Sequence, residues 1–133
     1  MSFTLNGDLA ELAHMMTEVE RFCAAQGLMG DPQFQLTLAI DELFTNAVRH
    51  GGCKGVAAAV EIRLDAADGA VRVEFRDRGT PFDPLTVPPP DLKAPLEERA
   101  KGGLGVHFVR QIMQNLQYDR CGEWNRLTME LPT

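Results

Sequence analysis

Apolar residues recur at steps of three and four in two long segments of the first fifty residues, which is the spacing of a helix face turned toward a core. The first helix is predicted over residues 8–26, with Asp8 as its N-terminal cap. The second is predicted to start at Asp31-Pro32, where the acid caps and the proline takes the first helical position, and to end near His50. Each helix therefore has one face for a core.

A second, polar row runs beside the apolar stripe of the second helix. Glu42, Asn46, Arg49 and His50 recur at the same three- and four-residue steps as the apolar positions. Charged groups at the margin of a buried face are unusual, because they favour the solvent side of a helix. The row is a candidate functional surface, although Arg49 and His50 are equally well explained as solvated cations near a helix C-terminus.

Alternation of apolar and polar residues indicates strands that bury one face and expose the other. Two such strands form a hairpin in the middle of the chain, and a shorter strand lies near its start. A third helix is predicted over residues 104–115, and two more strands follow it. The predicted strands are 2–5, 57–65, 70–77, 116–121 and 125–131. Residues 78–103 carry most of the prolines and no sustained periodicity, which is typical of a lid or binding loop.

Composition and charge narrow the classes of function. At 133 residues the chain is long enough for one domain with a single core. Its net charge of -6 argues against a nucleic-acid surface, which needs clustered Lys and Arg, and against an electrostatic membrane anchor. Three widely spaced cysteines favour free thiols in a reducing compartment over a zinc site or a disulfide scaffold. Because no signal peptide or membrane-spanning run is evident, we expect a cytoplasmic protein.

Asp77 keeps the parity of the inward positions Val71, Val73 and Phe75, so its side chain is expected to point toward the core at the end of its strand. A buried carboxylate is costly unless it accepts hydrogen bonds. One explanation is that it accepts them from amides of the following loop. The other is that it accepts one from the exocyclic amine of a bound base, which Gly79 would allow to approach closely.

The segment KGGLGVHFV, Lys101 to Val109, is a glycine cluster that leads directly into the third predicted helix. Glycines leave backbone N–H groups accessible, and a helix start adds partial positive charge, so the two together can bind an anion. The segment lacks the Gly-Lys-Ser/Thr of a P-loop and the preceding strand of a dinucleotide fold. Taken alone, it is also typical of an ordinary helix start.

Three segments, taken in order, resemble one family. ELFTNAVRH resembles the N box, DRGTP the first glycine box and GGLGVHFV the second glycine box of the Bergerat-type ATP-binding domain of gyrase-type topoisomerases, heat-shock chaperones and histidine kinases. Within that group, LAIDELFTNAVRHG and GGLGVHFVRQIMQ are most similar to the anti-sigma-factor serine/threonine kinases of bacterial partner-switching systems. The resemblance covers essentially the whole chain.

The resemblance implies a fold as well as a ligand. It implies a single histidine-kinase-like ATPase domain over residues 1–133 with an α+β architecture. That architecture is a two-layer α/β sandwich, in which a mixed, mostly antiparallel sheet has about three helices on one face. ATP would lie between the helix layer and a lid at about residues 78–103.

The same resemblance assigns roles to the polar row. Asn46 would give its side-chain oxygen to Mg²⁺, a hard cation that bridges phosphates. Glu42, one turn earlier, would act as the general base toward the acceptor hydroxyl or orient it. Arg49 and His50 would lie toward the phosphates.

The two glycine boxes would form the nucleotide pocket. Asp77 would accept a hydrogen bond from the adenine amine, and Gly79 and Pro81 would shape the pocket around the base. Phosphate contacts would come from the second glycine box. The nucleotide-binding residues expected there are Lys101, Gly102, Gly103, Leu104, Gly105 and Val106. For the lysine, a solvated position in the lid is an equal alternative.

The chain departs from the family pattern in two places. Gly51-Gly52-Cys53 follows VRH, where the family often has a small residue and an aromatic, so a looser helix end is expected. The last strand of the family often carries a Thr near the adenine. Here Asn125 falls at that place and Thr128 lies on the other strand face, and the sequence assigns a role to neither.

The resemblance implies an ATP- and Mg²⁺-dependent kinase that transfers the γ-phosphate to a Ser or Thr of a small, STAS-type anti-sigma-factor antagonist. A sigma factor would be a second partner, and a homodimer is possible. The alternative is a nucleotide-gated module that binds such a partner with little or no transfer. Glu42 favours the enzyme, whereas the stiff Pro88-Pro89-Pro90 run in the lid favours the binding module. A detached histidine kinase lobe is disfavoured, because no phosphoacceptor helix pair precedes the N box.

Overall fold

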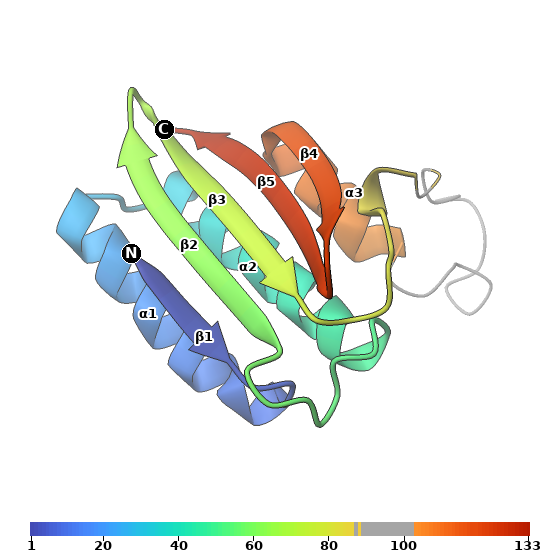
Figure 1. Ribbon diagram of the computed structural model, residues 1–133. Coiled ribbons are helices and arrows are strands. Elements are labelled where there is room, and N and C mark those ends of the chain that lie inside the picture. Colours follow the sequence, from blue (N-terminus) through green and yellow to red (C-terminus); the bar gives the residue numbers. More distant parts are fainter. Residues whose placement is uncertain (87, 89–102) are drawn as a thin grey trace.

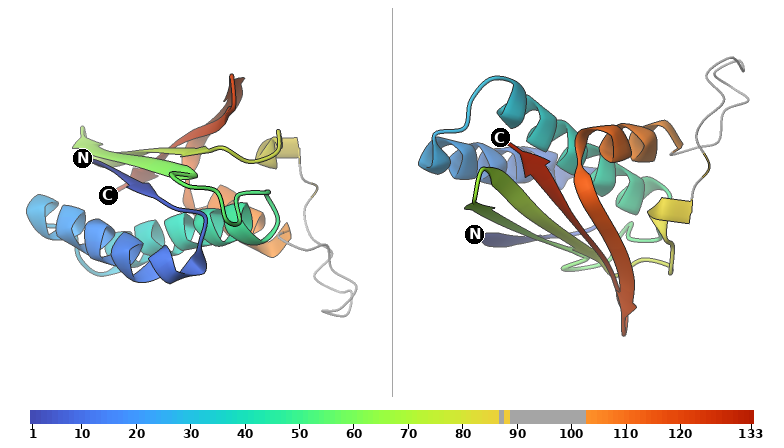
Figure 2. Two further views of the ribbon diagram at one scale, coloured as in Figure 1. Left: turned by 60° about the horizontal axis from the view of Figure 1, so that its bottom comes forward. Right: turned by 90° about the horizontal axis from the view of Figure 1, so that it is seen from above.

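The computed structural model describes residues 1–86, 88 and 103–133, and in it helices form one layer against one face of a five-stranded sheet (Figures 1 and 2). The strand order is β1-β2-β3-β5-β4, and every neighbouring pair is antiparallel. The elements are β1 Ser2–Leu5, α1 Leu12–Gln26, α2 Asp31–Arg49, β2 Val60–Ala67, β3 Ala70–Asp77, α3 Gly103–Ile112, β4 Gln114–Cys121 and β5 Trp124–Pro132. This is the predicted α+β sandwich, with a sheet that is antiparallel rather than mixed.

The central helix α2 has the apolar stripe that its sequence predicts. Seven of its residues are buried: Leu36, Ala39, Ile40, Leu43, Phe44, Ala47 and Val48. They pack in the core between the helix layer and the sheet. Because the stripe is turned inward, the neighbouring positions Glu42 and Asn46 lie half-buried at its margin. Packing of the apolar face thus sets the orientation of the polar row.

The predicted start of α2 is wrong by one position. Gly30, not Asp31, precedes the helix, and no side-chain hydrogen bond caps it. Gly30 has φ 68° and ψ -136°, a conformation that disfavours other residues, and this turn places Asp31 inside the first helical turn. A carboxylate there still interacts favourably with the helix dipole.

Asp8 caps a helix start as predicted, but the first turn that it caps is a short 3₁₀ helix. Its Oδ1 accepts a hydrogen bond from Ala10 N at 2.9 Å, within the 3₁₀ turn Leu9–Glu11 (η1) that precedes α1. A second 3₁₀ turn, Pro84–Thr86 (η2), follows β3. Among the described residues, no helix has both the length and the apolar character to cross a membrane.

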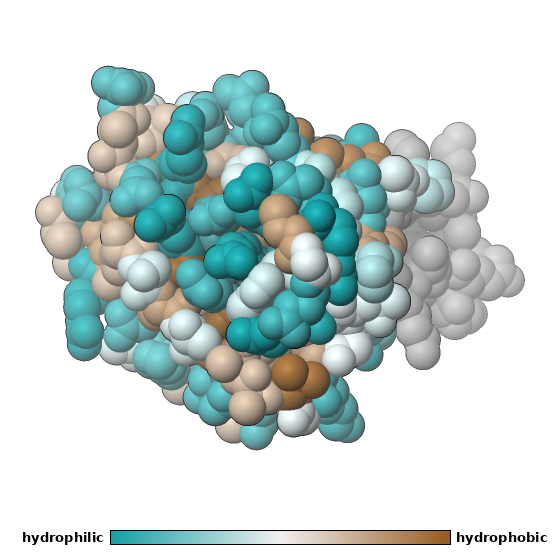
Figure 3. Space-filling model, in the orientation of Figure 1, coloured by the Kyte–Doolittle hydropathy of each residue, from teal (hydrophilic) through white to brown (hydrophobic). Residues whose placement is uncertain are grey.

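The two faces of the sheet differ as the alternation predicts. The inward apolar residues of β2, β3 and β5 are at most 5% exposed: Val60, Ile62, Leu64, Val71, Val73, Phe75, Leu127, Met129 and Leu131. The opposite face carries ion pairs between strands, such as Arg76 with Glu61 and Arg126 with Glu74. Figure 3 shows polar side chains over much of this face. The sheet is therefore apolar toward the helices and polar on its other side.

Three chain segments that carry the predicted boxes meet at one end of the molecule. The end of β3, the last turn of α2 and the first turn of α3 all lie toward the right-hand side of Figure 1. A backbone hydrogen bond from Thr80 N to Gly51 O, 2.9 Å long, joins the segment after β3 to the segment after α2. The fold thus brings the three boxes together.

We expect the buried stripe of α2 to dominate stability. Ile40 is fully buried, so Ile40→Ala should lower the free energy of unfolding by about 2–5 kcal/mol and Ile40→Val by about 0.5–1.5 kcal/mol. Urea denaturation measures both. Arg21→Ala on the exposed side of α1 is the control and should change stability by no more than about 0.5 kcal/mol. A loss for Ile40→Ala as small as that of the control would contradict the packing of α2.

Candidate functional site

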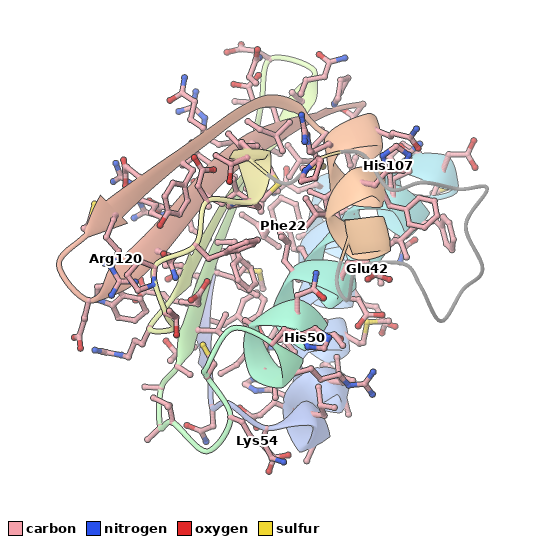
Figure 4. All side chains as sticks on the ribbon, turned by 90° about the vertical axis from the view of Figure 1, so that its right-hand side faces the viewer. Phe22, Glu42, His50, Lys54, His107 and Arg120 are labelled. Atoms are coloured by element: carbon pink, nitrogen blue, oxygen red, sulfur yellow. The ribbon has the colours of Figure 1, made fainter. Side chains whose placement is uncertain are left out.

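The start of α3 lies directly on the acid and the amide of α2. An ideal Cβ placed on Gly105 would be 2.5 Å from Glu42 Oε2 and 3.1 Å from Asn46 Nδ2. Only a residue without a side chain allows this approach. Figure 4 shows Glu42 beside the first turns of α3. Two of the predicted boxes are therefore in contact through one glycine.

Burial raises the pKa of the Glu42 carboxyl above its ordinary value, and the neighbouring charge of Asp41 adds to the effect. A carboxylate with a raised pKa is a better match for proton transfer near neutral pH than an ordinary surface acid. Within the described part of the chain, the Glu42 carboxylate has no hydrogen-bond or ion-pair partner. It is thus a half-buried acid that is free to accept a proton.

Asn46 presents its amide at the same place. Its side chain makes no hydrogen bond to any described residue. The described residues also contain no group of three or more His, Cys, Asp or Glu side chains that could hold a metal ion. Mg²⁺ usually takes only one or two protein oxygens and completes its shell with phosphates and water. Asn46 could therefore supply one oxygen to a magnesium ion that is also bound by phosphates and water.

Asp77, at the end of β3, uses one oxygen for the protein and keeps the other available. Its Oδ1 accepts hydrogen bonds from Gly79 N at 2.9 Å, from Asn125 Nδ2 at 3.0 Å and from Cys53 Sγ at 3.8 Å. Its Oδ2 accepts none from the described residues. The first explanation, a hydrogen bond from the following loop, is confirmed, and the second, a hydrogen bond from a bound base, stays a prediction.

The loop over residues 77–82 is held from three directions. Thr80 N donates to Gly51 O, and Arg120 donates to Gly79 O at 2.8 Å. Asn125 donates a hydrogen bond to Thr80 O and accepts one from Phe82 N. A Cβ on Gly79 would overlap the carbonyl oxygen of Gly51, so glycine is required there. These hydrogen bonds hold the loop in one conformation beside Asp77.

The expectation of a looser end of α2 at Gly51-Gly52-Cys53 is wrong. Gly51 N donates to Asn46 O at 2.9 Å, and the Gly51 carbonyl accepts the bond from Thr80. Cys53 is buried against Asp77, and burial raises the pKa of its thiol to about 11. The thiol is therefore protonated at neutral pH and can donate to the carboxylate. The small residues permit the close contact between two loops that an aromatic side chain would prevent.

For four other predicted site residues, the structure shows exposure or burial but no side-chain hydrogen bond to Glu42, Asn46 or Asp77. Pro81, Arg49 and His50 are exposed, and Val106 is buried. Arg49 lines a separate hollow of about 510 Å³ with residues such as Gly7. Contact of Arg49 and His50 with phosphates thus stays a prediction.

The second glycine box is described only in part. Gly103 and Leu104 form the first turn of α3, ahead of Gly105. Lys101, Gly102 and most of the predicted lid lie outside the described residues. The phosphate contacts expected from this box stay a prediction too.

The sequence placed Asn125 near the adenine without assigning it a role, and it gave no indication of Tyr118 or Arg120 as neighbours of this site. Asn125 is the register partner of Asp77, and Tyr118 and Arg120 on β4 contact Asn125 and the loop. One signal was available, because Asn125 has the inward parity of Leu127 and Met129. A polar residue at an apolar position, on the strand paired with β3, marks a buried hydrogen-bond network.

Comparison with known proteins places this geometry in a family. The model of the histidine kinase-like ATPase domain matches residues 5–131. The serine/threonine-protein kinase BtrW of Bordetella bronchiseptica is 34% identical over 97 residues, covering 73% of this chain and 68% of BtrW. These matches confirm the resemblance and the fold class that the sequence predicted.

Solved structures agree on the fold. The RsbU and RsbW domains of a Mycobacterium tuberculosis protein match over 99% of this chain with a TM-score of 0.72 at 17% identity. This chain spans only 32% of that longer structure. A histidine kinase domain from the Erythrobacter litoralis blue-light activated histidine kinase matches over 92% of this chain and 59% of its own, with a TM-score of 0.52 at 20% identity.

The contact at Gly105 can be tested by adding one methyl group. Gly105→Ala should displace the Glu42 carboxylate, which is the end of a flexible side chain, and should weaken Mg·ATP binding several-fold in calorimetry. Stability should stay the same or rise by up to about 1 kcal/mol, because alanine is a better helix residue than glycine. Gln111→Ala, on the exposed side of α3, is the matched control for helix propensity. Unchanged nucleotide affinity in Gly105→Ala would contradict this arrangement.

The raised pKa of Glu42 predicts how stability depends on pH. In the folded protein this carboxyl resists ionisation, so its charged form costs stability and its neutral form does not. Glu42→Gln should match the wild type in melting temperature at pH 4 and exceed it as pH rises through the folded pKa. Thermal melts between pH 4 and 8 measure the difference, with Glu20→Gln on the exposed side of α1 as the control. If Glu42→Gln raised the melting temperature most at low pH, the predicted direction of the pH dependence would be wrong.

Proposed function

This chain belongs to the histidine kinase-like ATPase domain family, and we propose that it is an ATP-dependent serine/threonine protein kinase of the anti-sigma-factor type. The observation that carries the proposal is the contact of Gly105 with Glu42 and Asn46. This contact brings an acid, an amide and the start of a helix together, and Asp77 would be the residue that recognises the base. The named relative BtrW is itself a serine/threonine-protein kinase, which supports the same reaction class.

Nucleotide binding would use the two ends of the site differently. The free Oδ2 of Asp77 would accept a hydrogen bond from the adenine amine. The N–H groups at the start of α3 would face the phosphates, where the helix dipole favours negative charge. Asn46 would supply an oxygen to Mg²⁺, which when bound neutralises phosphate charge.

Phosphoryl transfer requires the protein mainly to position the reactants and to neutralise charge. Glu42 would accept the proton of the acceptor hydroxyl as that oxygen bonds to the γ-phosphorus and the bond to ADP breaks. Its raised pKa suits this role, because the proton has to be held only while transfer proceeds. The acidic overall charge is no obstacle, since the anion-binding groups are backbone amides of α3.

The acceptor would be a Ser or Thr on a STAS-type anti-sigma-factor antagonist, and a sigma factor would compete for or share the nucleotide-bound protein. Both partners would meet it in the cytoplasm, where ATP is supplied. Family membership and the BtrW relationship support this assignment of partners. A homodimer is compatible with the proposal but is not required by the site.

Two substitutions separate binding from transfer. Asn46→Ala should weaken Mg·ATP binding by about 10-fold or more, because a charge-assisted contact is lost. Glu42→Gln should keep binding within about 3-fold and lower transfer at least about 100-fold, because the proton acceptor is removed. Calorimetry with Mg·ATP and labelled-phosphate transfer to a candidate antagonist domain are the measurements, with Glu20→Gln as the control.

The outcomes distinguish the candidate functions. Binding of ATP by the wild type without transfer to any antagonist domain would favour the nucleotide-gated binding module. Full transfer activity in Glu42→Gln would contradict the role of this acid but leave an enzyme. Absence of ATP binding by the wild type would refute the proposal as a whole.

A further inference from the structure

Asn125 is the one polar residue that is buried among those the structure describes, with 6% of its surface exposed. Its Nδ2 donates to Asp77 Oδ1 at 3.0 Å and to Thr80 O at 2.9 Å. Its Oδ1 accepts from Phe82 N at 3.3 Å and from the Tyr118 hydroxyl at 2.5 Å. A primary amide has two N–H donors and two acceptor positions, so Asn125 is fully bonded.

The partners fix the direction of each bond. Carboxylate and carbonyl oxygens of Asp77 and Thr80 can only accept, so the NH₂ group must face them. The amide of Phe82 can only donate, so the oxygen must face it. The Tyr118 hydroxyl consequently donates to Asn125 and does not accept from it. The network therefore runs in one direction, from Tyr118 through Asn125 to Asp77.

This direction determines what Asp77 can offer to a ligand. Three donors converge on its Oδ1, including Asn125 and the backbone of Gly79, so the protein itself occupies this oxygen. Its Oδ2 is then an acceptor with no donor in the described part of the chain. Because Asn125 has no bonding capacity left, it cannot contact a nucleotide base itself. It can act only through Asp77 and through the loop backbone that it holds.

We propose that Asn125 and Tyr118 are positioning residues that give the pocket its preference for a purine with an exocyclic amine over one with a carbonyl at the same position. They hold Asp77 Oδ2 at a fixed place relative to the loop at Thr80 and Phe82. A base with an amine donates to that oxygen, whereas a carbonyl there meets the carboxylate with no hydrogen between them. This inference rests on the proposed nucleotide-binding function and adds the origin of its base selectivity.

Tyr118→Phe is the sharpest test, because it removes one hydroxyl and keeps the ring. Asn125 Oδ1 would retain only the 3.3 Å bond from Phe82 N, so the amide and the carboxylate would be held less firmly. We expect Mg·ATP affinity to fall about 3- to 10-fold and Mg·ITP affinity to change less than about 2-fold. A change of this size is expected when one hydrogen bond that holds Asp77 indirectly, from Tyr118 to Asn125, is lost. The measured quantity is the ratio of the two dissociation constants by calorimetry.

Two further variants complete the experiment. Thr128→Val is the matched control, because it removes a hydroxyl from β5 on the opposite face of the sheet and should leave the ratio unchanged. Asn125→Thr keeps one hydroxyl between Tyr118 and Asp77 and should shift the ratio in the same direction as Tyr118→Phe. It keeps the test decisive if the tyrosine variant fails to fold, which a thermal melt shows.

Trp124 offers an independent local readout. It is the single tryptophan of the chain and precedes Asn125, and its ring centroid is 4.5 Å from the guanidinium carbon of Arg76 and 4.1 Å from that of Arg78. Its emission should shift in Tyr118→Phe if the loop is held less firmly, and it should not shift in Thr128→Val. An unshifted emission in Tyr118→Phe would count against the positioning role.

The results separate this inference from the proposed function. Binding of ATP with a preference over ITP that survives in both Tyr118→Phe and Asn125→Thr would overturn the inference and leave the function standing. Equal loss of affinity for both nucleotides would also overturn it, because that is the signature of a structural role. Failure of the wild type to bind ATP would instead refute the proposed function.

Discussion

Burial of the apolar stripe of α2 orients the rest of the site. Ile40 and Phe44 pack into the core with no exposed surface, and a helix that buries this face has no freedom to rotate. Glu42 and Asn46 are then fixed at the margin, where α3 packs against them through Gly105. The functional groups are placed by hydrophobic packing and close backbone approach, and neither requires a polar contact between the acid and the amide.

The periodicity of the chain was sufficient to predict the layers, because helices and one-sided sheets each repeat at a fixed interval. The polar row of α2 was visible for the same reason. Contacts between strands were not predictable, since they depend on register. Tyr118 and Asn125 are seven residues apart in sequence and become partners only when β4 pairs with β5. The looser helix end expected at Gly51 failed similarly, because the loop that it contacts comes from β3.

Several polar groups of this site either reduce the stability of the fold or need hydrogen-bond partners in order to be buried. Ionised Glu42 is disfavoured by burial, as its raised pKa shows. Asn125 is tolerated in the core because each of its donors and acceptors is matched. A chain under selection for stability alone would fill these positions with apolar residues. Their presence at one end of the sheet is therefore better explained by ligand binding than by folding.

The two ends of the site differ in how much the protein prepares them. At the end where a base would bind, Gly79, Thr80 and Phe82 are held by hydrogen bonds with Arg120 of β4, Gly51 after α2 and Asn125 of β5, so little ordering would remain to be done on binding. At the end where phosphates would bind, Glu42 and Asn46 have no hydrogen-bond partner among the described residues, and α3 begins beside them. A ligand bound first by its base would then bring its phosphates to groups that have no competing bonds. Recognition would thus be prepared in advance, while the groups for chemistry stay available until the nucleotide completes them.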